Sequence, residues 1–417
     1  MLARSIEKIA MAAKAASRLT ALAPSRLKES ALKSAARALA AAKEEVLAAN
    51  RSDVGRAKKR KLAPALIDRL TLDEKRVGSM VLALEEIAAL ADPVGEVAAE
   101  WTNPAGVRIQ KVRVPLGVVA MVYESRPNVT VEAAALALKA GNSVILRGGS
   151  EAVRSNTALA RILSRAVSAA GMPRDSVSFI SDTDRENIAV LAGLDRWIDL
   201  LIARGSERMV RAITRMASVP VLGHGKGVCH VYVDGGADLK MAEEIAFNAK
   251  VQRPGVCNAM ECLIVHKSVS KSFLPAIGRR YREAGVAVNG DEACRALIPE
   301  ARRAAGSDWA REYLALEVSV KVVDSIERAI DHIHRYGSGH TDSIVTGDAA
   351  AAEKFLREVD SAAVFHNLST RLHDGGVFGL GAEIGISTQK LHARGTMGVR
   401  ELTTTKYAAR GSGQVRT

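Results

Sequence analysis

Cys257 and its neighbours form the segment whose residue types point most directly to chemistry. Residues 251–259 read VQRPGVCNA, and an apolar stripe before them predicts a helix over 238–250. Pro254 ends such a helix and Gly255 allows a close backbone approach, so the loop presents one thiol at a fixed point. A thiol held in this way suits a nucleophile. On this segment alone, a small apolar core residue is the competing interpretation.

Two glycine turns follow predicted strands and are candidate phosphate sites. The turn RGGS at 147–150 follows a strand at 143–147, and RGS at 204–206 follows a strand at 197–202. Backbone N–H groups that open a helix beside a cation bind phosphate. A plain helix cap is the alternative for each turn. Two such turns on one sheet edge are nevertheless what a nucleotide site requires.

The elements that must position these residues alternate along the chain. Residues 1–92 have the Ala, Leu, Lys and Glu content of helices, and a βαβ unit follows over 118–147. Strands and helices then alternate to residue 367, which is typical of parallel sheets covered by helices. The predicted strands are too many for one sheet, so we expect two α/β domains that divide near 235–236.

Composition and charge narrow the class of protein. The 417 residues are 48% hydrophobic and 25% charged, as in a soluble globular protein, and no apolar run has the length of a membrane span. The four cysteines lack zinc-ligand spacing, so we expect thiols, no metal site and a cytoplasmic location.

The net charge of +13 raises the alternative of nucleic-acid binding, with the run RAKKRK at 56–61 as its densest point. Aromatic residues are only 4% and no recognition motif is present, so a solvated helix or turn is favoured for this run. A basic surface also favours anionic substrates and phosphate-bearing cofactors.

Four long segments together resemble one enzyme family. They are 114–152, the cysteine loop 251–259, RYGSGHTDSIVT at 335–346, and the tail at 374–404. Each resembles γ-glutamyl phosphate reductase, a branch of the aldehyde dehydrogenase superfamily also called glutamate-5-semialdehyde dehydrogenase. The resemblance implies an aldehyde dehydrogenase-like α/β fold with two parallel-sheet domains and a small β oligomerisation arm. On this basis 1–105 and 116–235 form the NADPH-binding domain, 236–385 the catalytic domain, and 106–115 and 403–417 the arm.

The same resemblance implies a reaction. Cys257 attacks the acyl phosphate of L-glutamyl 5-phosphate, phosphate leaves, and the resulting thioester is reduced with NADPH to L-glutamate 5-semialdehyde. This is the second step of proline biosynthesis. The backbone N–H of Cys257 and the side-chain amide of Asn128 match the superfamily's oxyanion donors.

Further roles follow from the resemblance alone. Ser150 stands where NAD-preferring relatives often carry a glutamate, so NADPH is the expected cofactor. Gly205 and Ser206 resemble the turn that holds the pyrophosphate, and Glu312 the glutamate that grips the nicotinamide ribose; a solvated helix residue is the alternative for Glu312. The implied cofactor-binding residues are Arg147, Ser150, Gly205, Ser206 and Glu312. The implied substrate-binding residues are Ser125, Arg126, Gly385 and Ser387.

One absence distinguishes the candidate reactions. Hydrolytic aldehyde dehydrogenases carry a general-base glutamate in the stretch that here reads VLGHGKGVCH, at 221–230, without a carboxylate. A thioester would then survive for reduction or for attack by phosphate, which favours a phosphorylating reductase. The alternatives are a dehydrogenase of another semialdehyde and an inactive basic relative.

The partners follow from the same reasoning. The extended segments 107–115 and 403–411 are predicted to pair in the arm, and an unpaired edge of that length calls for a second copy of the chain. We expect a small acyl phosphate substrate, a homo-oligomer, and a transient contact with the upstream glutamate 5-kinase, with no nucleic acid and no membrane.

Overall fold

The computed structural model describes residues 2–223 and 225–416 of the chain. The fold consists of two compact units. Unit 1 comprises Met1–Gly223, Gly379–Gly385 and Met397–Thr417, and unit 2 comprises His224–Phe378 and Ile386–Thr396. The predicted ranges that include residues 1, 224 and 417 extend at those positions outside the described residues. Among the described residues, no helix combines the length and the apolar character needed to traverse a bilayer.

Unit 1 begins with helices, as its Ala- and Leu-rich sequence predicts. The second helix buries Leu32, Ala35 and Leu39 at helical spacing and packs on the fifth. Asp73 caps the fifth helix by accepting a hydrogen bond from the Arg76 backbone N–H. The helices are α1 (Leu2–Thr20), α2 (Ser25–Ala41), α3 (Lys43–Lys59), α4 (Pro64–Leu70) and α5 (Glu74–Ala89).

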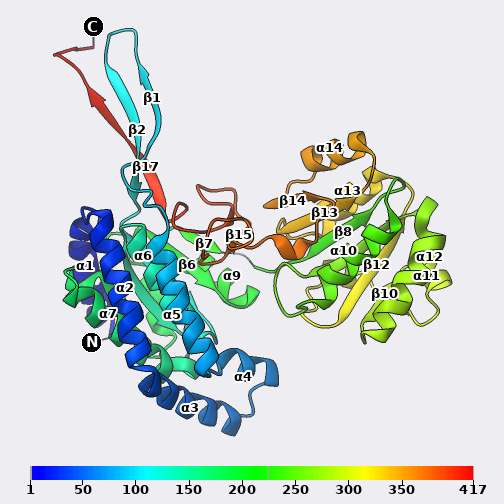
Figure 1. Cartoon of the computed structure of the whole chain (residues 1–417), viewed down its shortest axis with the longest axis horizontal. Helices are drawn as coiled ribbons and strands as arrows, with labels where there is room; N and C mark the ends of the chain where they lie inside the picture. Colours follow the sequence, from blue (N-terminus) through cyan, green and yellow to red (C-terminus); the bar gives the residue numbers. More distant parts are fainter. Residues whose placement is uncertain (1, 224, 417) are drawn as a thin grey trace. The chain divides into compact units, whose positions relative to one another are not determined.

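A parallel five-stranded sheet, in the order β5-β4-β3-β6-β7, forms the centre of unit 1 (Figure 1). Every residue of β3 and β4 is buried, which explains their continuous apolar runs. The strands are β3 (Val118–Tyr123), β4 (Ser143–Gly148), β5 (Val177–Phe179), β6 (Leu200–Arg204) and β7 (Val221–Gly223). The helices between them are α6 (Pro127–Lys139), α7 (Val153–Ala169), α8 (Glu186–Ala192) and α9 (Glu207–Met216). The carboxyl ends of β3, β4 and β6 meet because Tyr123 lies opposite Gly148 and Arg204.

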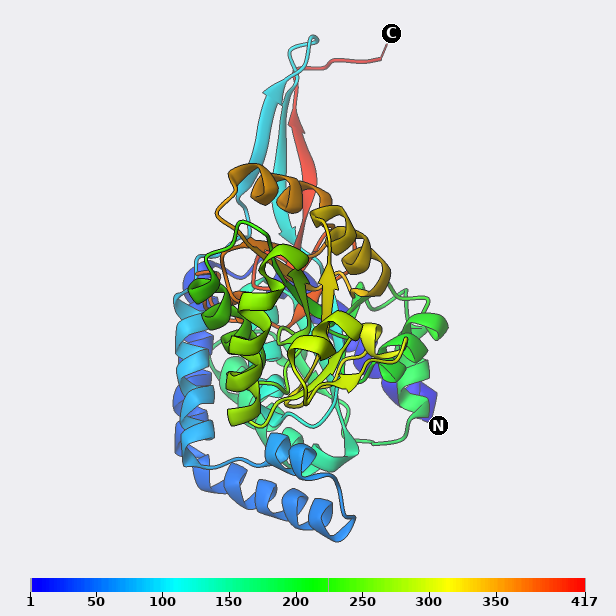
Figure 2. The same ribbon diagram turned by 90° about the vertical axis from the view of Figure 1, so that its right-hand side faces the viewer.

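An antiparallel ribbon of three strands extends from the rest of unit 1 in both views (Figures 1 and 2). Its strands are β1 (Val97–Thr102), β2 (Arg108–Pro115) and β17 (Thr403–Arg410). β17 pairs with β2 from Thr403 opposite Pro115 to Arg410 opposite Arg108, so the predicted pairing of the tail with 107–115 is confirmed. The sequence places the residues of the third strand, β1, in the cofactor domain. All six are exposed, so the strand lacks the apolar pattern by which a buried strand is predicted.

Unit 2 contains a parallel seven-stranded sheet in the order β11-β10-β12-β9-β8-β13-β14. One apolar core lies under α10, α11 and α12, and a second lies on the opposite face under α13 and α14. The strands are β8 (Cys229–Val233), β9 (Met260–His266), β10 (Ala287–Gly290), β11 (Arg302–Arg303), β12 (Glu317–Val323), β13 (Thr341–Val345) and β14 (Ala363–His366). The helices are α10 (Leu239–Val251), α11 (Lys267–Glu283), α12 (Glu292–Leu297), α13 (Ile326–Tyr336) and α14 (Ala349–Glu358). A short pair, β15 (Ile386–Ser387) and β16 (Gly395–Thr396), also belongs to unit 2.

The boundary between the units differs from the expected one. The sequence places it near 235–236, whereas the first unit ends at Gly223. The reason is that β8 pairs with β9 and β13 and therefore belongs to the second sheet. The tail is also divided, because Gly379–Gly385 returns to unit 1.

Candidate active site

Cys257 lies on a loop between α10 and β9, as the sequence predicts, and its side chain is half-buried. The loop backbone is contacted from one side by the start of β8 and the residues just before it. The Cys229 Sγ lies 3.2 Å from the Cys257 carbonyl oxygen, to which it donates. A Cβ added at Gly227 would lie 1.9 Å from the same oxygen, so only glycine fits there.

A buried ion pair joins the two ends of this loop. The Lys250 Nζ, in the last turn of α10, lies 2.6 Å from the Glu261 Oε2, at the start of β9, and both side chains are 0% exposed. Burial raises the pKa of the Glu261 carboxyl to about 7, against the opposing effect of Lys250. Glu261 is therefore engaged in holding the loop closed.

The other three cysteines are buried thiols. Burial raises the pKa of Cys229 and Cys262 far above the usual range, and that of Cys294 to about 12. These thiols stay protonated near neutral pH, and only a thiolate is a strong nucleophile. Cys257 is the one cysteine whose side chain is partly exposed.

Two arginines that were not predicted as site residues belong to the surroundings of Cys257: Arg253 is part of its loop, and Arg371 is hydrogen-bonded to two residues of that loop. The Arg371 guanidinium donates to the Asn258 Oδ1 and, at 2.9 Å, to the Gln252 Oε1. Burial and the charge of Arg253 lower the pKa of Arg371, while negative charge on Cys257 raises it. Arg371 thus brings a second cation to the Cys257 loop, which itself carries Arg253. The fold brings Arg371 there from more than one hundred residues along the chain, which no local motif could reveal.

Glu312 lies in the same part of unit 2. It belongs to a loop after a short 3-10 turn, so the alternative of a helix residue is wrong. Its Oε1 accepts from the Gly227 backbone N–H at 2.8 Å. Glu312 therefore positions the glycine that contacts the Cys257 carbonyl.

In unit 1, Ser125, Arg126 and Asn128 follow the carboxyl end of β3. The Ser125 backbone N–H and Oγ donate to the Glu151 Oε1 at 2.6 and 2.9 Å. Asn128 lies in the first turn of α6 and donates to the Glu132 Oε1 at 2.9 Å. The amide predicted to bind an oxyanion thus has a carboxylate as its acceptor.

The predicted phosphate turn at 204–206 has a carboxylate at one of its backbone N–H groups. The Ser206 backbone N–H, at the start of α9, donates to the Glu124 Oε2 at 2.9 Å. A Cβ at Gly205 would lie 2.6 Å from that same oxygen. The carboxylate stands in for an anion at a helix N-terminus, where phosphate groups bind in other proteins.

A model of the aldehyde dehydrogenase family matches residues 2–315. Two proteins named gamma-glutamyl phosphate reductase, from Moorella thermoacetica and Halothermothrix orenii, are 54% and 51% identical, over 93% and 97% of both chains. The crystal structure of gamma-glutamyl phosphate reductase from Thermotoga maritima has a TM-score of 0.96 at 45% identity, covering 99% of this chain and 100% of that one. The chain belongs to the γ-glutamyl phosphate reductase branch of the aldehyde dehydrogenase family.

Solved structures of lower sequence identity share only the fold with this chain. An acetylating aldehyde dehydrogenase from Geobacillus thermoglucosidasius is 16% identical with a TM-score of 0.70, over 100% of this chain and 98% of that one. The predicted aldehyde dehydrogenase-like fold is confirmed.

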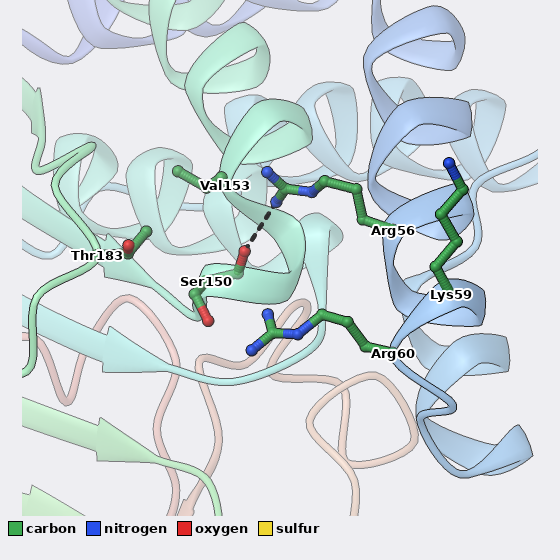
Figure 3. A pocket seen from close by; sticks show the side chains of 6 residues that line it. All are labelled: Arg56, Lys59, Arg60, Ser150, Val153 and Thr183. Carbon is green, nitrogen blue, oxygen red and sulfur yellow. Dashed lines mark hydrogen bonds between the residues drawn. The ribbon is translucent and has the colours of Figure 1, made fainter.

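A basic pocket of about 400 Å³ adjoins Ser150 in this reductase family member (Figure 3). Arg56 and Arg60 point from the C-terminal end of α3 toward Ser150, and the Arg56 Nη2 donates to the Ser150 carbonyl at 3.0 Å. Lys59 also lines the pocket. The run at 56–61 ends α3 and continues into a turn, with residues 58–61 exposed as the sequence predicts, and it also supplies three cations to the lining of this pocket.

Arg147, a predicted cofactor-binding residue, is bound to the backbone of its own unit. It is 6% exposed, and its Nη2 donates to the carbonyl oxygens of Thr183 and Asp184 at 2.8 and 3.2 Å. Burial lowers its pKa. Arg147 holds the loop after β5, so the cations that face Ser150 in the pocket come from α3.

The two tail residues predicted to bind substrate fall in different units. Gly385, in unit 1, has φ 145° and its carbonyl accepts from the Met397 N–H at 2.8 Å. Ser387, in unit 2, is buried, and its Oγ accepts from the Gln389 N–H at 3.2 Å. Unit 1 holds Ser125, Arg126, Asn128, Arg147, Ser150, Gly205, Ser206 and Gly385, and unit 2 holds Cys257, Glu312 and Ser387.

Proposed function

We infer that this chain reduces L-glutamyl 5-phosphate to L-glutamate 5-semialdehyde and releases phosphate, the second step of proline biosynthesis. The observation that carries the inference is the 54% identity to a γ-glutamyl phosphate reductase over 93% of both chains. The fixed loop presenting Cys257 supplies the chemistry that the reaction requires.

Catalysis begins at Cys257. Its thiolate attacks the acyl carbon, the bond to the phosphate oxygen breaks, and a thioester forms on the enzyme. NADPH, when bound, supplies the hydride that reduces this thioester. Collapse of the resulting thiohemiacetal then releases the aldehyde and restores the thiolate. We assign the oxyanion of each tetrahedral step to the Cys257 backbone N–H and the Asn128 amide.

We assign Arg253 and Arg371 to the phosphate of the substrate. Arg253 is part of the Cys257 loop, and Asn258 and Gln252 of the same loop hold the Arg371 guanidinium in place. Guanidinium groups bind phosphate oxygens through charge-assisted, often bidentate hydrogen bonds. Such contacts stabilise the leaving group as its negative charge develops.

We assign the preference for NADPH to the basic pocket beside Ser150. Its three cations and the absence of a carboxylate at position 150 suit the 2′-phosphate of the adenosine ribose. The pyrophosphate is assigned to Gly205 and Ser206, whose N–H it would take from Glu124. Substrate contacts remain assigned to Ser125, Arg126, Gly385 and Ser387, and the nicotinamide ribose to Glu312.

The arm supports assembly with a second copy of the chain. Trp101 and Tyr407, on β1 and β17, are 43% and 67% exposed and meet edge-on with ring centroids 6.0 Å apart. Exposed aromatic residues on a ribbon of this kind are typical of an interface. We expect light scattering to report a homo-oligomer and the Trp101→Lys/Tyr407→Lys variant to dissociate. A stable monomer of the unmodified chain contradicts the assignment.

We propose a cytoplasmic location, since all four cysteines are thiols. A transient contact with glutamate 5-kinase would shorten the path of the labile acyl phosphate. These two proposals rest on the thiols and on the substrate chemistry respectively.

The alternative reactions are separated by one assay in the reverse direction. With glutamate 5-semialdehyde and NADP, we expect NADPH formation at a steady rate only when inorganic phosphate is present. Equal steady rates without phosphate would indicate a hydrolytic dehydrogenase. Absence of turnover with phosphate, in protein whose folding is verified by circular dichroism, would indicate the inactive relative.

A further inference from the structure

A row of buried polar residues crosses the centre of the unit 2 sheet. Asp342 of β13 lies opposite His230 of β8, and His230 lies opposite Cys262 of β9. All three are 0% exposed. Residues directly opposite one another project from the same face of a sheet. Here that face is the one covered by α13, because Cys262 belongs to the apolar core that includes Ile330 and Ile333.

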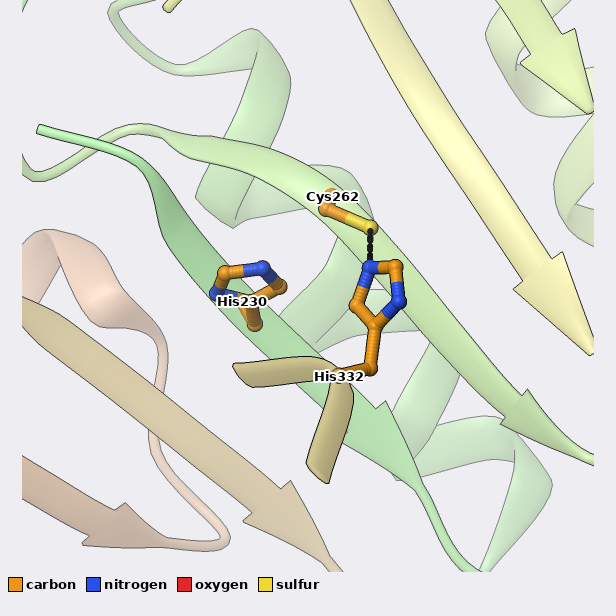
Figure 4. A group of neighbouring side chains, drawn as sticks. All are labelled: His230, Cys262 and His332. Atoms are coloured by element: carbon orange, nitrogen blue, oxygen red, sulfur yellow. Dashed lines mark hydrogen bonds between the residues drawn. The ribbon is translucent and has the colours of Figure 1, made fainter. Parts of the chain in front are cut away.

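His332 reaches this row from α13 and is 4% exposed. Its Nε2 lies 3.6 Å from the Cys262 Sγ. The candidate ligand atoms of His230, Cys262 and His332 all lie within 4.8 Å of one another. Figure 4 shows both imidazole rings beside the cysteine, from three different elements. Atoms that share a zinc ion are about 3.5 Å apart, given bonds of about 2.0–2.3 Å, so side-chain shifts of about 1 Å complete the geometry.

His230 has a ring nitrogen that no described residue satisfies. Its Nδ1 lies 2.8 Å from the Asp342 Oδ1, and its Nε2 is buried without a hydrogen-bond partner. A carboxylate at Nδ1 holds the proton there and leaves a lone pair on Nε2. Metal-bound histidines have this arrangement, with a carboxylate behind the imidazole. An unsatisfied buried polar atom in a native fold calls for an explanation, and a bound ion supplies one.

Aromatic side chains fix the position of the His332 ring. Trp309 and Tyr336 pack against it with ring centroids at 5.4 and 4.7 Å. The imidazole is therefore held in place beside the sulfur by rigid neighbours.

We propose that His230, Cys262 and His332 bind a Zn²⁺ ion in unit 2. Binding forms one Zn–S and two Zn–N bonds, and the Cys262 S–H proton is released to solvent; no redox change is involved. Two imidazoles and one thiolate are ligands that zinc takes in proteins. The ion would join β8, β9 and α13. It would thus link the strands that precede and follow the segment formed by α10 and the Cys257 loop. The proposal departs from the expectation of no metal and does not depend on the reductase activity.

Cobalt titration tests the site, because Co²⁺ replaces Zn²⁺ and absorbs visibly when tetrahedral and thiolate-bound. The background is Cys257→Ala, which removes the exposed thiol. We expect one Co²⁺ per chain, with thiolate charge-transfer absorption that Zn²⁺ abolishes. Cys262→Ala should abolish this absorption, and His332→Ala should weaken the affinity for Co²⁺ at least tenfold. It should persist in Cys294→Ala, a matched loss of a buried thiol.

A second measurement keeps the test decisive where Cys262→Ala does not fold. In the otherwise unmodified Cys257→Ala chain, Zn²⁺ should raise the thermal midpoint and slow alkylation of Cys262 in mild denaturant, leaving Cys294 unprotected. Absence of stoichiometric cobalt binding overturns the proposal. Binding that survives in folded Cys262→Ala, or protection of Cys294 equal to that of Cys262, also overturns it.

Discussion

The loop that carries Cys257 and the strand-end turns of unit 1 are held by different kinds of contact. In unit 1, backbone N–H groups that follow β3 and β6 donate to protein carboxylates. The Ser125 N–H donates to Glu151, and the Ser206 N–H donates to Glu124. A ligand phosphate can exchange with a carboxylate at modest cost, since both are anions. The Cys257 loop is instead closed by buried contacts. In our proposal, cofactor phosphates displace carboxylates in unit 1, whereas buried contacts hold the Cys257 loop in one position.

The largest effect is expected from removal of the proposed nucleophile. Cys257→Ala should lower turnover by about 10⁴-fold or more, because no group with comparable reactivity can replace a covalent catalyst. NADPH binding, measured by fluorescence titration, should be unchanged, since Cys257 is not among the residues proposed to bind the cofactor. Cys294→Ala serves as the control and should keep most activity. Comparable turnover in Cys257→Ala and the unmodified enzyme would contradict the assignment of Cys257 as the nucleophile.

The rigidity of the loop is tested at Gly227. The added Cβ of Gly227→Ala meets the Cys257 carbonyl oxygen at 1.9 Å, so the loop backbone must shift. We expect about 10²-fold lower kcat, as displacements of about 1 Å can cause, and a loss of about 1–3 kcal/mol in stability. Gly306→Ala, in the same unit with nothing within 4 Å of its Cβ, is the matched control. Equal kinetics in the two variants would show that the loop tolerates movement.

The exchangeable region is tested through its cations. Arg60→Ala should weaken NADPH binding by about tenfold, and Arg56→Ala similarly, because each removes a guanidinium from the proposed 2′-phosphate pocket. NADH binding should change little. Arg165→Ala, in another basic pocket of unit 1, is the control. Equal losses of affinity for NADPH and NADH would show that the 2′-phosphate binds elsewhere.

The elements of both regions were largely predictable, and their partners were not. The helix before the cysteine loop and the strands before both turns are confirmed within a few residues, because apolar periodicity is local. The buried pair Lys250–Glu261 and the cation Arg371 were not found. Each depends on which residues the fold brings together, and a lone lysine or arginine in a sequence is most often solvated.

Strand β1 and the domain boundary were missed for related reasons. β1 is wholly exposed and carries no buried pattern, and the place of β8 depends on strand pairing between distant segments. The cluster of His230, Cys262 and His332 is another case, since its members are separated by 32 and 70 residues and match no ligand spacing.

The last expected difference between the units concerns pH. All nine histidines lie between residues 224 and 392, so unit 1 has none. Burial, and then the charge of His340, lowers the pKa of His373 to about 3. The unfolded chain binds this proton near pH 6.5, so stability is complete above that pH and falls as the pH decreases toward 3, by up to about 1.4 kcal/mol per pH unit.

Hydrogen exchange at pH 7 and pH 5 resolves this difference between the units. Protection should fall more in unit 2 than in unit 1, and His373→Gln should reduce the difference. A uniform loss across both units, unaffected by His373→Gln, would contradict the role given to this histidine.

The central claim is that Cys257, on its fixed loop, carries the acyl group and that no base hydrolyses it. The direct measurement is peptide mass spectrometry after acid quenching of enzyme mixed with NADP and glutamate 5-semialdehyde without phosphate. The account predicts about one glutamyl thioester per chain, on the peptide that contains Cys257, and its discharge when phosphate is added. Free glutamate formed without phosphate, or an adduct on Cys229, Cys262 or Cys294, would contradict it.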